Sequence, residues 1–207
     1  MSLAIVRSRA QLGVAAPEVT VEVHLSGGLP KTNIVGLPEA AVREARDRVR
    51  AAIMNARIEF PKRRITVGLA PADLPKEGSR FDLAIALGIL AASGYLPRKS
   101  LEGREFLGEL GLSGELRAVT GVLPAVLKAH GDGRCLIVPE GNAAEAALVR
   151  GADVRTARSL LDVCAHLRGT ADLARVAAAA IGAATHGPDL ADVRGQAQAR
   201  RALEIAA

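Results

Sequence analysis

The sequence predicts a mixed α/β fold, and three stretches carry this prediction. In residues 64–70 every second position is apolar, which is the period of a half-buried strand. Residues 81–95 hold one charge, Asp82, and a helix that is apolar on nearly every side must be buried on nearly every side. Residues 135–167 alternate between strand and helix patterns, which favours parallel pairing in an α/β layer.

The amino-terminal part supplies the first predicted elements of this sheet. Residues 2–7, 19–25 and 32–37 have the alternation or the apolar character of strands. Pro38 follows, at a position where its missing N–H costs little, and it begins a predicted helix over residues 39–56.

The helix over residues 39–56 has an apolar stripe and a strongly charged opposite face. Pairs four residues apart, such as Glu44 with Arg48, cancel much of that charge. Two interpretations remain for Arg46 and Arg50, namely an ordinary solvated helix face or a contact with nucleic acid.

A second basic cluster, Lys62, Arg63 and Arg64, lies at the entry to the strand over residues 64–70 and has no acid nearby in the sequence. Phosphate contacts need charge but no sequence readout, so such a patch suits DNA. The alternative is a basic strand end at the surface.

The second half of the predicted domain follows the buried helix. A polar loop is expected over 98–104 and a hairpin over 106–119, and Pro124 is tolerable only in the first turn of a helix. Ser159 is a plausible N-cap. The remaining expected elements are helix 121–130, strand 135–138, helix 142–149, strand 154–156 and helix 159–167.

Composition narrows the possible function classes. The net charge of +5 and the pI of about 9.8 permit an anionic partner, but the charges are spread along the chain. Aromatic residues make up only 2% of the chain, which disfavours a stacking surface for single-stranded bases.

Nothing in the sequence indicates export or a membrane anchor. Cys135 and Cys164 have no metal or redox spacing and are expected to be small buried apolar residues in a reduced cytosol. The start of the chain has no cleavage signal, and the apolar run over 83–96 is too short to span a bilayer. We therefore expect a cytoplasmic protein without membrane contact.

The composition shifts near the carboxyl end. We expect one domain over residues 1–170, an alanine-rich linker over 171–188, and the beginning of a second, truncated unit over 189–207. The last unit ends in a helical pattern with apolar residues along one side.

The chain carries five long motifs: SLAIVRSRAQLGV, VTVEVHLSGGLP, IVGLPEAAVREARDRVRAAI, APADLPKEGSRFDLAIALGILAASG and DVRGQAQARRALEIAA. Together they resemble the amino-terminal half of the Mg-chelatase-like AAA+ proteins of the YifB and ComM type. The resemblance implies a domain of the ribosomal-protein-S5-domain-2-like, Lon-protease-like (ChlI-type) fold, followed by the start of an AAA+ ATPase domain. It further implies a DNA branch-migration motor of natural transformation that acts as a homo-hexameric ring, with ATP and Mg²⁺ bound by the full-length protein.

The nucleotide site itself is not expected in these residues. A phosphate-cradling Walker loop needs G-x-x-x-x-G-K-[ST] after a strand, and no such stretch occurs in the 207 residues. Val193, Gly195 and Gln196 lie in a segment that resembles the one near the adenine in AAA+ proteins. We therefore expect no cofactor in this part of the protein.

The resemblance to Lon-type proteases also implies that peptidase activity is lost. Such enzymes need a serine that a lysine activates. In the matching stretches Arg80 takes the place of the nucleophile and Leu123 takes the place of the lysine. No catalytic residue is predicted, although a shifted pair of Ser79 with Lys76 or Lys128 is conceivable.

Other candidate constellations are sparse. The four histidines are scattered, and Asp162 with His166 alone gives no expected metal site. Near the charged hinge, residues 76–82, the acids Asp73, Glu77 and Asp82 suggest either a catalytic pair or caps and ion pairs with Lys76 and Arg80. The hinge is expected to contact a polyanion or a neighbouring subunit.

Three hypotheses for function therefore stand at this level. The first is a non-catalytic domain that binds DNA and supports assembly of an AAA+ ring. The second is an oligomerisation or regulatory platform without DNA contact, and the third is a residual Ser/Lys peptidase.

Overall fold

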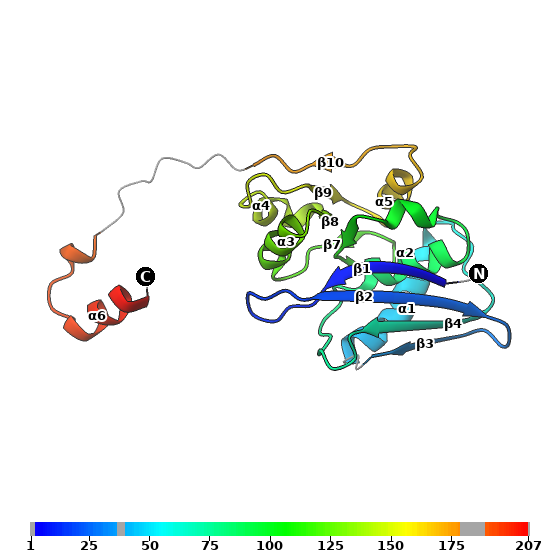
Figure 1. The fold of residues 1–207 in the computed structure, drawn as a ribbon, viewed down its shortest axis with the longest axis horizontal. Coiled ribbons are helices and arrows are strands. Elements are labelled where there is room, and N and C mark those ends of the chain that lie inside the picture. The colour runs from blue at the N-terminus through cyan, green and yellow to red at the C-terminus, as the bar shows by residue number, and fades with distance from the viewer. Residues whose placement is uncertain (1–2, 37–39, 179–188, 207) are drawn as a thin grey trace.

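The computed structural model describes residues 3–36, 40–178 and 189–206. An eight-stranded mixed sheet has the order β10-β9-β8-β5-β1-β2-β4-β3. Helices α1 and α2 lie together behind β1, β2, β4 and β3 (Figure 1). The predicted mixed α/β fold is therefore confirmed.

The sheet contains both parallel and antiparallel pairs. Strand β2 pairs antiparallel with β1 and β4, whereas β3–β4, β1–β5, β5–β8 and β8–β9 are parallel. The strands are β1 Leu3–Arg9, β2 Glu18–Ser26, β3 Lys31–Val35, β4 Arg64–Ala70, β5 Arg104–Phe106, β8 Cys135–Pro139, β9 Val154–Ala157 and β10 Ala174–Arg175. The pair β6 Glu109–Leu110 and β7 Leu116–Arg117 forms a separate hairpin.

The described helices agree with the predicted ones in position. They are α1 Ala40–Asn55, α2 Asp82–Ala92, α3 Val122–Gly131, α4 Ala143–Ala146, α5 Leu160–Leu167 and α6 Ala197–Ala206. Ser159 caps α5 through a capping box, in which Asp162 bonds back to the Ser159 backbone N–H. Because α4 covers a single turn, it is shorter than the predicted helix over 142–149.

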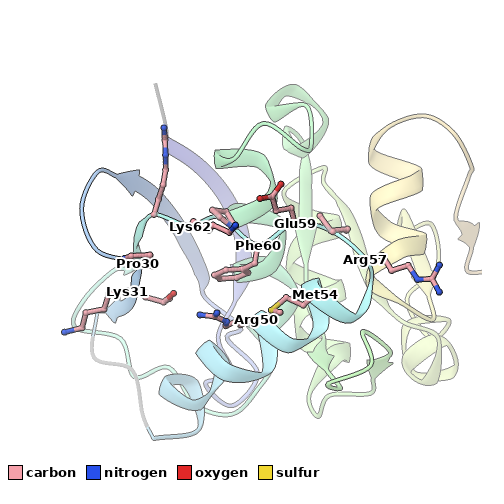
Figure 2. A pocket seen from close by; sticks show the side chains of 12 residues that line it. Pro30, Lys31, Arg50, Met54, Arg57, Glu59, Phe60 and Lys62 are labelled. Atoms are coloured by element: carbon pink, nitrogen blue, oxygen red, sulfur yellow. The ribbon is translucent and has the colours of Figure 1, made fainter.

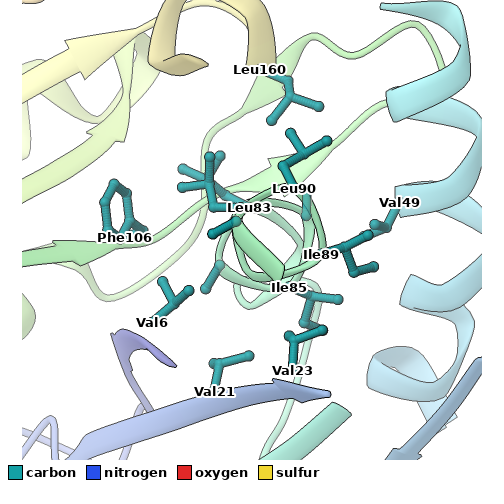
Figure 3. Close-up of a cluster of buried hydrophobic side chains, with 14 of the residues drawn as sticks. Val6, Val21, Val23, Val49, Leu83, Ile85, Ile89, Leu90, Phe106 and Leu160 are labelled. Atoms are coloured by element: carbon teal, nitrogen blue, oxygen red, sulfur yellow. The ribbon is translucent and has the colours of Figure 1, made fainter. Parts of the chain in front are cut away.

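Helix α2 is the centre of the larger core. All of its residues are buried, as the continuous apolar run predicts. Seen end-on in Figure 3, it is surrounded by side chains from β1 and β2 on one side, α1 on another and α5 on a third. Gly88 allows this close approach, since a Cβ there would lie 2.5 Å from the Cγ2 atom of Val23.

The two halves of the sheet differ in how they are covered. In β8, Leu136 and Val138 face a second core built with α3 and α4, whereas Ile137 faces the core around α2. In β1, β2 and β4 buried residues alternate with more exposed ones. A strand that is buried on both faces has a continuous apolar sequence, whereas a strand that is covered on one face has alternating apolar and polar residues.

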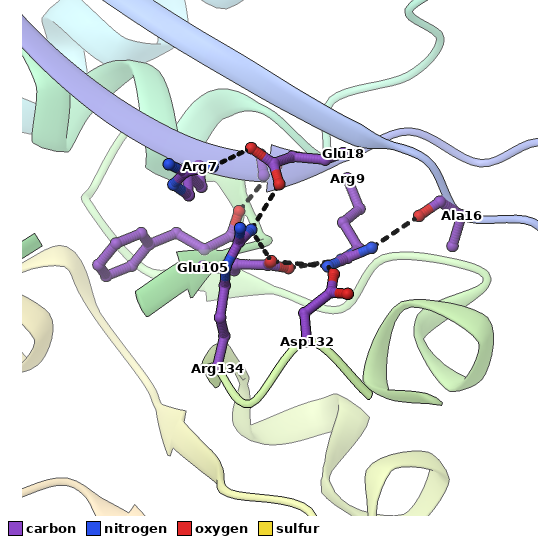
Figure 4. A network of polar contacts seen from close by, with 9 residues as sticks. Arg7, Arg9, Ala16, Glu18, Glu105, Asp132 and Arg134 are labelled. Carbon is purple, nitrogen blue, oxygen red and sulfur yellow. Dashed lines mark hydrogen bonds and ion pairs between the residues drawn. The ribbon is translucent and has the colours of Figure 1, made fainter. Parts of the chain in front are cut away.

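A network of ion pairs joins β1, β2, β5 and the segment that leads into β8 (Figure 4). The fully buried carboxylate of Glu105 accepts hydrogen bonds from Arg9 Nε at 2.5 Å and Nη2 at 2.7 Å, and from Arg134 Nη1 at 2.8 Å. Arg9 also bonds to Asp132, and Arg134 to Glu18. Paired in this way, the buried charges hold the middle of the sheet together.

Three local predictions differ from the structure. Residues 104–106 were expected at a loop end and in a hairpin, but they form β5, which pairs with β1 and β8 in the main sheet. Residues 98–101 are a 3-10 helix rather than a plain loop. Ala174 and Arg175 pair with β9, so the sheet extends past residue 170 into the stretch expected as linker. Strands of two or three residues are too short for periodicity to reveal.

The cysteines agree only in part with the expected burial. Cys164 is buried and Cys135 is half-buried, and both are free thiols. Burial raises the pKa of Cys135 to about 11 and the pKa of Cys164 to about 12. The thiolate is the reactive form, so both thiols should be almost inert near neutral pH.

We predict slow reaction of both cysteines with a thiol reagent such as dithionitrobenzoate at pH 8. With a pKa of about 11, only about one Cys135 thiol in a thousand is ionised at that pH. Absorbance should rise slowly in the folded protein and at once in denaturant, where two thiols per chain react. Rapid reaction of the folded chain would contradict the burial described above.

No described helix combines the length and the apolar character that crossing a membrane requires.

Candidate nucleic-acid interface

A pocket of about 590 Å³ opens between α1, β3 and the segment that leads into β4 (Figure 2). Its volume lies within the range of about 300–1,000 Å³ that is usual for ligand sites. A second hollow of about 620 Å³ shares five of its lining residues, which all lie in the segment 58–63. We call the first pocket the basic groove and the second the neighbouring hollow.

Five exposed cations line the basic groove, and Glu59 is the one acid among the described residues that line it. Within the described part of the chain, none of the five forms an ion pair. Unpaired exposed cations around one groove create a field that attracts anions. The five are Lys31, Arg50, Arg57, Lys62 and Arg63.

Phe60 provides the apolar element of the basic groove. Its ring points into the pocket in Figure 2, and the guanidinium carbon of Arg50 lies 5.3 Å from the ring centroid. This is a cation–π distance, so the ring positions Arg50 at the groove while the charge stays exposed. Met54, 53% exposed, adds a flexible apolar side chain.

The predicted DNA contacts fall into two groups. The structure brings Lys62, Arg63 and Arg50 together at the basic groove, although Arg50 comes from a different element. Arg64 does not line the groove. It is the exposed first residue of β4, before buried Ile65, and it stands opposite Lys31 in the backbone register of β3 and β4.

Arg46 also lies outside the residues that line the basic groove. It donates to Asp47 at 3.1 and 3.0 Å, so its charge is largely neutralised at the surface. Glu44 and Arg48 form the expected pair four residues apart, at 3.8 Å. The described face of α1 thus agrees with a solvated helix face except at Arg48, which is half-buried and bonds to Asp82, and at Arg50, which lines the groove.

Sequence reasoning missed two of the five groove cations. Lys31 follows the turn after β2, and Arg57 follows α1 in a left-handed conformation with φ of +58°. Neither belongs to a run of basic residues. Only the parallel pairing of β3 with β4 brings Lys31 beside the end of β4 that carries Arg63 and Arg64.

The hinge does not offer the charge that contact with a polyanion needs, while its expected contact with a neighbouring subunit stays a prediction. The hinge follows the end of β4 that lies opposite to the basic cluster, and a strand of this length spans about 20 Å. Moreover, Lys76, Arg80 and Asp82 are all at least 96% buried, so they cannot present charge to a polyanion. The exposed residues of the hinge are Glu77 and Gly78.

Asp82, one of the three acids near the hinge, has another partner than expected. Asp82 accepts hydrogen bonds from Arg48 at 2.7 and 3.0 Å, which ties α2 to α1. Burial raises the pKa of Asp82, and the ion pair with Arg48 opposes this shift. Lys76 donates to the carbonyl of Pro71, and Arg80 to backbone carbonyls.

The two positions of the degenerate protease pair do lie close together. Arg80 Nη2 donates to the carbonyl oxygens of Thr120 at 3.2 Å and Gly121 at 3.4 Å, three and two residues before Leu123. Burial lowers the pKa of Arg80. A buried guanidinium and a leucine side chain provide neither a nucleophile nor a base.

The conceivable shifted pairs are not formed among the described residues. The Ser79 hydroxyl donates to the carboxylate of Glu109, and Lys76 is held by Pro71. No group of three or more His, Cys, Asp or Glu side chains in the described part of the chain could hold a metal ion. Asp162, which was considered with His166 as a metal ligand, forms the capping box of α5 instead. His186 lies outside the described residues.

The described carboxyl-terminal segment does not enclose a nucleotide by itself. Helix α6 has no buried residue, Val193 is 41% exposed, and Gly195 and Gln196 precede α6 with positive φ. Since the sequence holds no Walker loop, the residues present do not fit an ATP site. The linker prediction falls mostly on residues 179–188, outside the described residues.

Comparisons with known proteins agree with this architecture. Residues 21–142 match the family model described as subunit ChlI of Mg-chelatase. The chain is 53% identical over 212 residues to competence protein ComM of Haemophilus influenzae. The aligned region covers 100% of this chain and 42% of that protein. It is 52% and 49% identical over 207 residues to the YifB proteins of Salmonella typhimurium and Escherichia coli, covering all of this chain and 41% of each.

These relatives are longer proteins, and the chain spans about two fifths of their length. The match covers more than half of the chain and includes strands β3 to β8, the buried helix α2 and the basic groove. The chain therefore belongs to the Mg-chelatase ChlI-like family, the family of ComM and YifB.

Proposed function

We propose that this chain is a non-catalytic DNA-binding domain of an AAA+ ATPase of the ComM type. The observation that carries the proposal is the basic groove. Five exposed cations line it, and none of these five forms an ion pair with another described residue. Phosphate contacts dominate the affinity of proteins for DNA, and unpaired lysines and arginines supply them. The name of the competence protein ComM is consistent with a role in DNA uptake.

The proposal extends to the whole protein. The longer relatives leave room for an ATPase domain after residue 207, which would bind ATP and Mg²⁺ and assemble as a homo-hexameric ring. Such a ring would act in the cytoplasm as a branch-migration motor, and the present domain would hold DNA against it. Hydrolysis would belong to the ring and not to the described residues.

The test is a triple variant of groove cations, Lys31→Ala/Lys62→Ala/Arg63→Ala, in a mobility or anisotropy assay with duplex DNA. If each cation neutralises one phosphate, the slope of log K against log salt should flatten by about 3. At 0.1 M salt the affinity should fall on the order of a hundredfold, because counterion release supplies most of such binding.

Lys128→Ala/Arg150→Ala/Arg194→Ala is the matched control, since these three cations are also exposed and do not line the basic groove. It should keep the affinity within a few-fold. Equal losses in both variants would mean that only net charge matters. No binding by the parent chain at moderate salt would instead favour an oligomerisation platform without DNA contact.

A further inference from the structure

Two half-buried aromatic rings lie at the basic groove and the neighbouring hollow, one within the shared segment 58–63 and one across the hollow from it. Phe60 lines the groove, and Tyr95 lines the hollow. We propose that these rings receive unpaired bases, so that the site takes single-stranded DNA in preference to duplex. This inference rests on the proposed function and names the form of nucleic acid that the same site binds.

The chain is poor in aromatic residues, which makes their placement informative. It holds three phenylalanines, one tyrosine and no tryptophan. Phe81 and Phe106 are fully buried in the core around α2. The other two rings, half of the set, both lie at the hollows on either side of residues 58–63. The fold thus gathers the aromatic surface that composition alone disfavours.

Each of the two rings has an arginine over its face. Arg50 lies 5.3 Å from the ring centroid of Phe60, and Arg168 lies 5.1 Å from that of Tyr95. Both arginines are exposed, and they come from α1 and from the end of α5. Planar guanidinium groups stack on bases as they do on aromatic rings, so a base can stack on the outer face of each arginine or take its place on the ring.

The cations around the two rings suit the phosphates of a DNA single strand that runs past these rings. Lys62 and Arg63 line both hollows, and Lys31 and Arg57 extend the basic surface of the groove. A groove of cations that follows the backbone, combined with rings that stack on bases, is the usual way to bind single strands. In duplex DNA the base faces are already stacked on each other and cannot reach the rings.

Both rings also pack against the core, and this contact must be separated from ligand binding. Replacing each ring by leucine keeps much of the apolar contact and removes the stacking plane. The variant Phe60→Leu/Tyr95→Leu therefore tests the rings as binding groups, and circular dichroism with a thermal melt verifies that the variant folds.

The first measurement compares an oligothymidylate with a duplex of equal length. The parent chain should prefer the oligothymidylate. Phe60→Leu/Tyr95→Leu should lose roughly 10- to 100-fold in affinity for the single strand. Its duplex affinity should stay within a few-fold of the parent and its salt slope should not change, because the variant retains every cation of the groove.

The second measurement uses Tyr95 as a reporter. With one tyrosine and no tryptophan in the chain, its emission reports on this one position. Oligothymidylate should quench it with the same midpoint as binding, and duplex should not. Tyr95→Phe should keep single-strand affinity, since phenylalanine retains the stacking ring.

The outcomes separate the inference from the proposed function. The inference is overturned if Tyr95 stays unquenched and the leucine variant keeps its single-strand affinity. If duplex binding still depends on Lys62 and Arg63 in that case, the proposed function stands. No binding to either form of DNA by the folded parent chain overturns both. Quenching together with a selective loss of single-strand affinity supports the inference.

Discussion

Glu105→Gln is expected to lower the free energy of unfolding by about 3–5 kcal/mol. The Glu105 carboxylate is fully buried and accepts three hydrogen bonds from Arg9 and Arg134. Arg9 is itself only 3% exposed. Glutamine keeps the shape but removes the negative charge, so the guanidinium groups stay in the interior with reduced compensation, which is what makes breaking a buried pair costly.

Urea denaturation followed by circular dichroism measures this loss. Glu102→Gln provides the matched control, because Glu102 lies three residues away and is exposed. Its effect should stay within about 0.5 kcal/mol, as for most surface changes. A similar small effect for Glu105→Gln would show that the network in Figure 4 contributes little to stability.

Leu87→Ala is the second change with a large expected effect, about 2–5 kcal/mol of lost stability. Leu87 is fully buried in the middle of α2, where the surrounding elements meet. Alanine is the better helix former, so a loss cannot come from helix propensity. It must come from the removed apolar contact and from the cavity that remains.

Leu148→Ala serves as the reference for this substitution, since Leu148 is 62% exposed. The same urea titration should give it a change within about 0.5 kcal/mol. If Leu87→Ala were equally mild, the core around α2 would have to repack without a cavity. The central position of α2 would then be less important than its burial indicates.

The site could be predicted in part because its charges are clustered in the chain. Lys62 and Arg63 stand together in the sequence without an acid next to them, and they line the basic groove. Arg64 and Arg46, predicted by the same local argument, do not line the groove, and Arg46 bonds to Asp47. Adjacency in the sequence does not decide which side of a strand or helix a side chain occupies.

The sequence by itself determined the features that depend on local pattern. The apolar run of α2 required burial, the alternation in β4 required one covered face, and Ser159 indicated a helix start. Hydrophobic period and capping chemistry act within a few residues, so they can be read without knowing the fold.

Only the tertiary structure decided which distant groups meet. It placed Lys31 beside the basic cluster, paired Asp82 with Arg48 instead of a hinge cation, and brought Phe60 and Tyr95 to two hollows that share a wall. The physical reason is that ion pairs and grooves depend on how elements pack against one another. Arg48 and Asp82 are 34 positions apart in the sequence, so no local pattern predicts their contact.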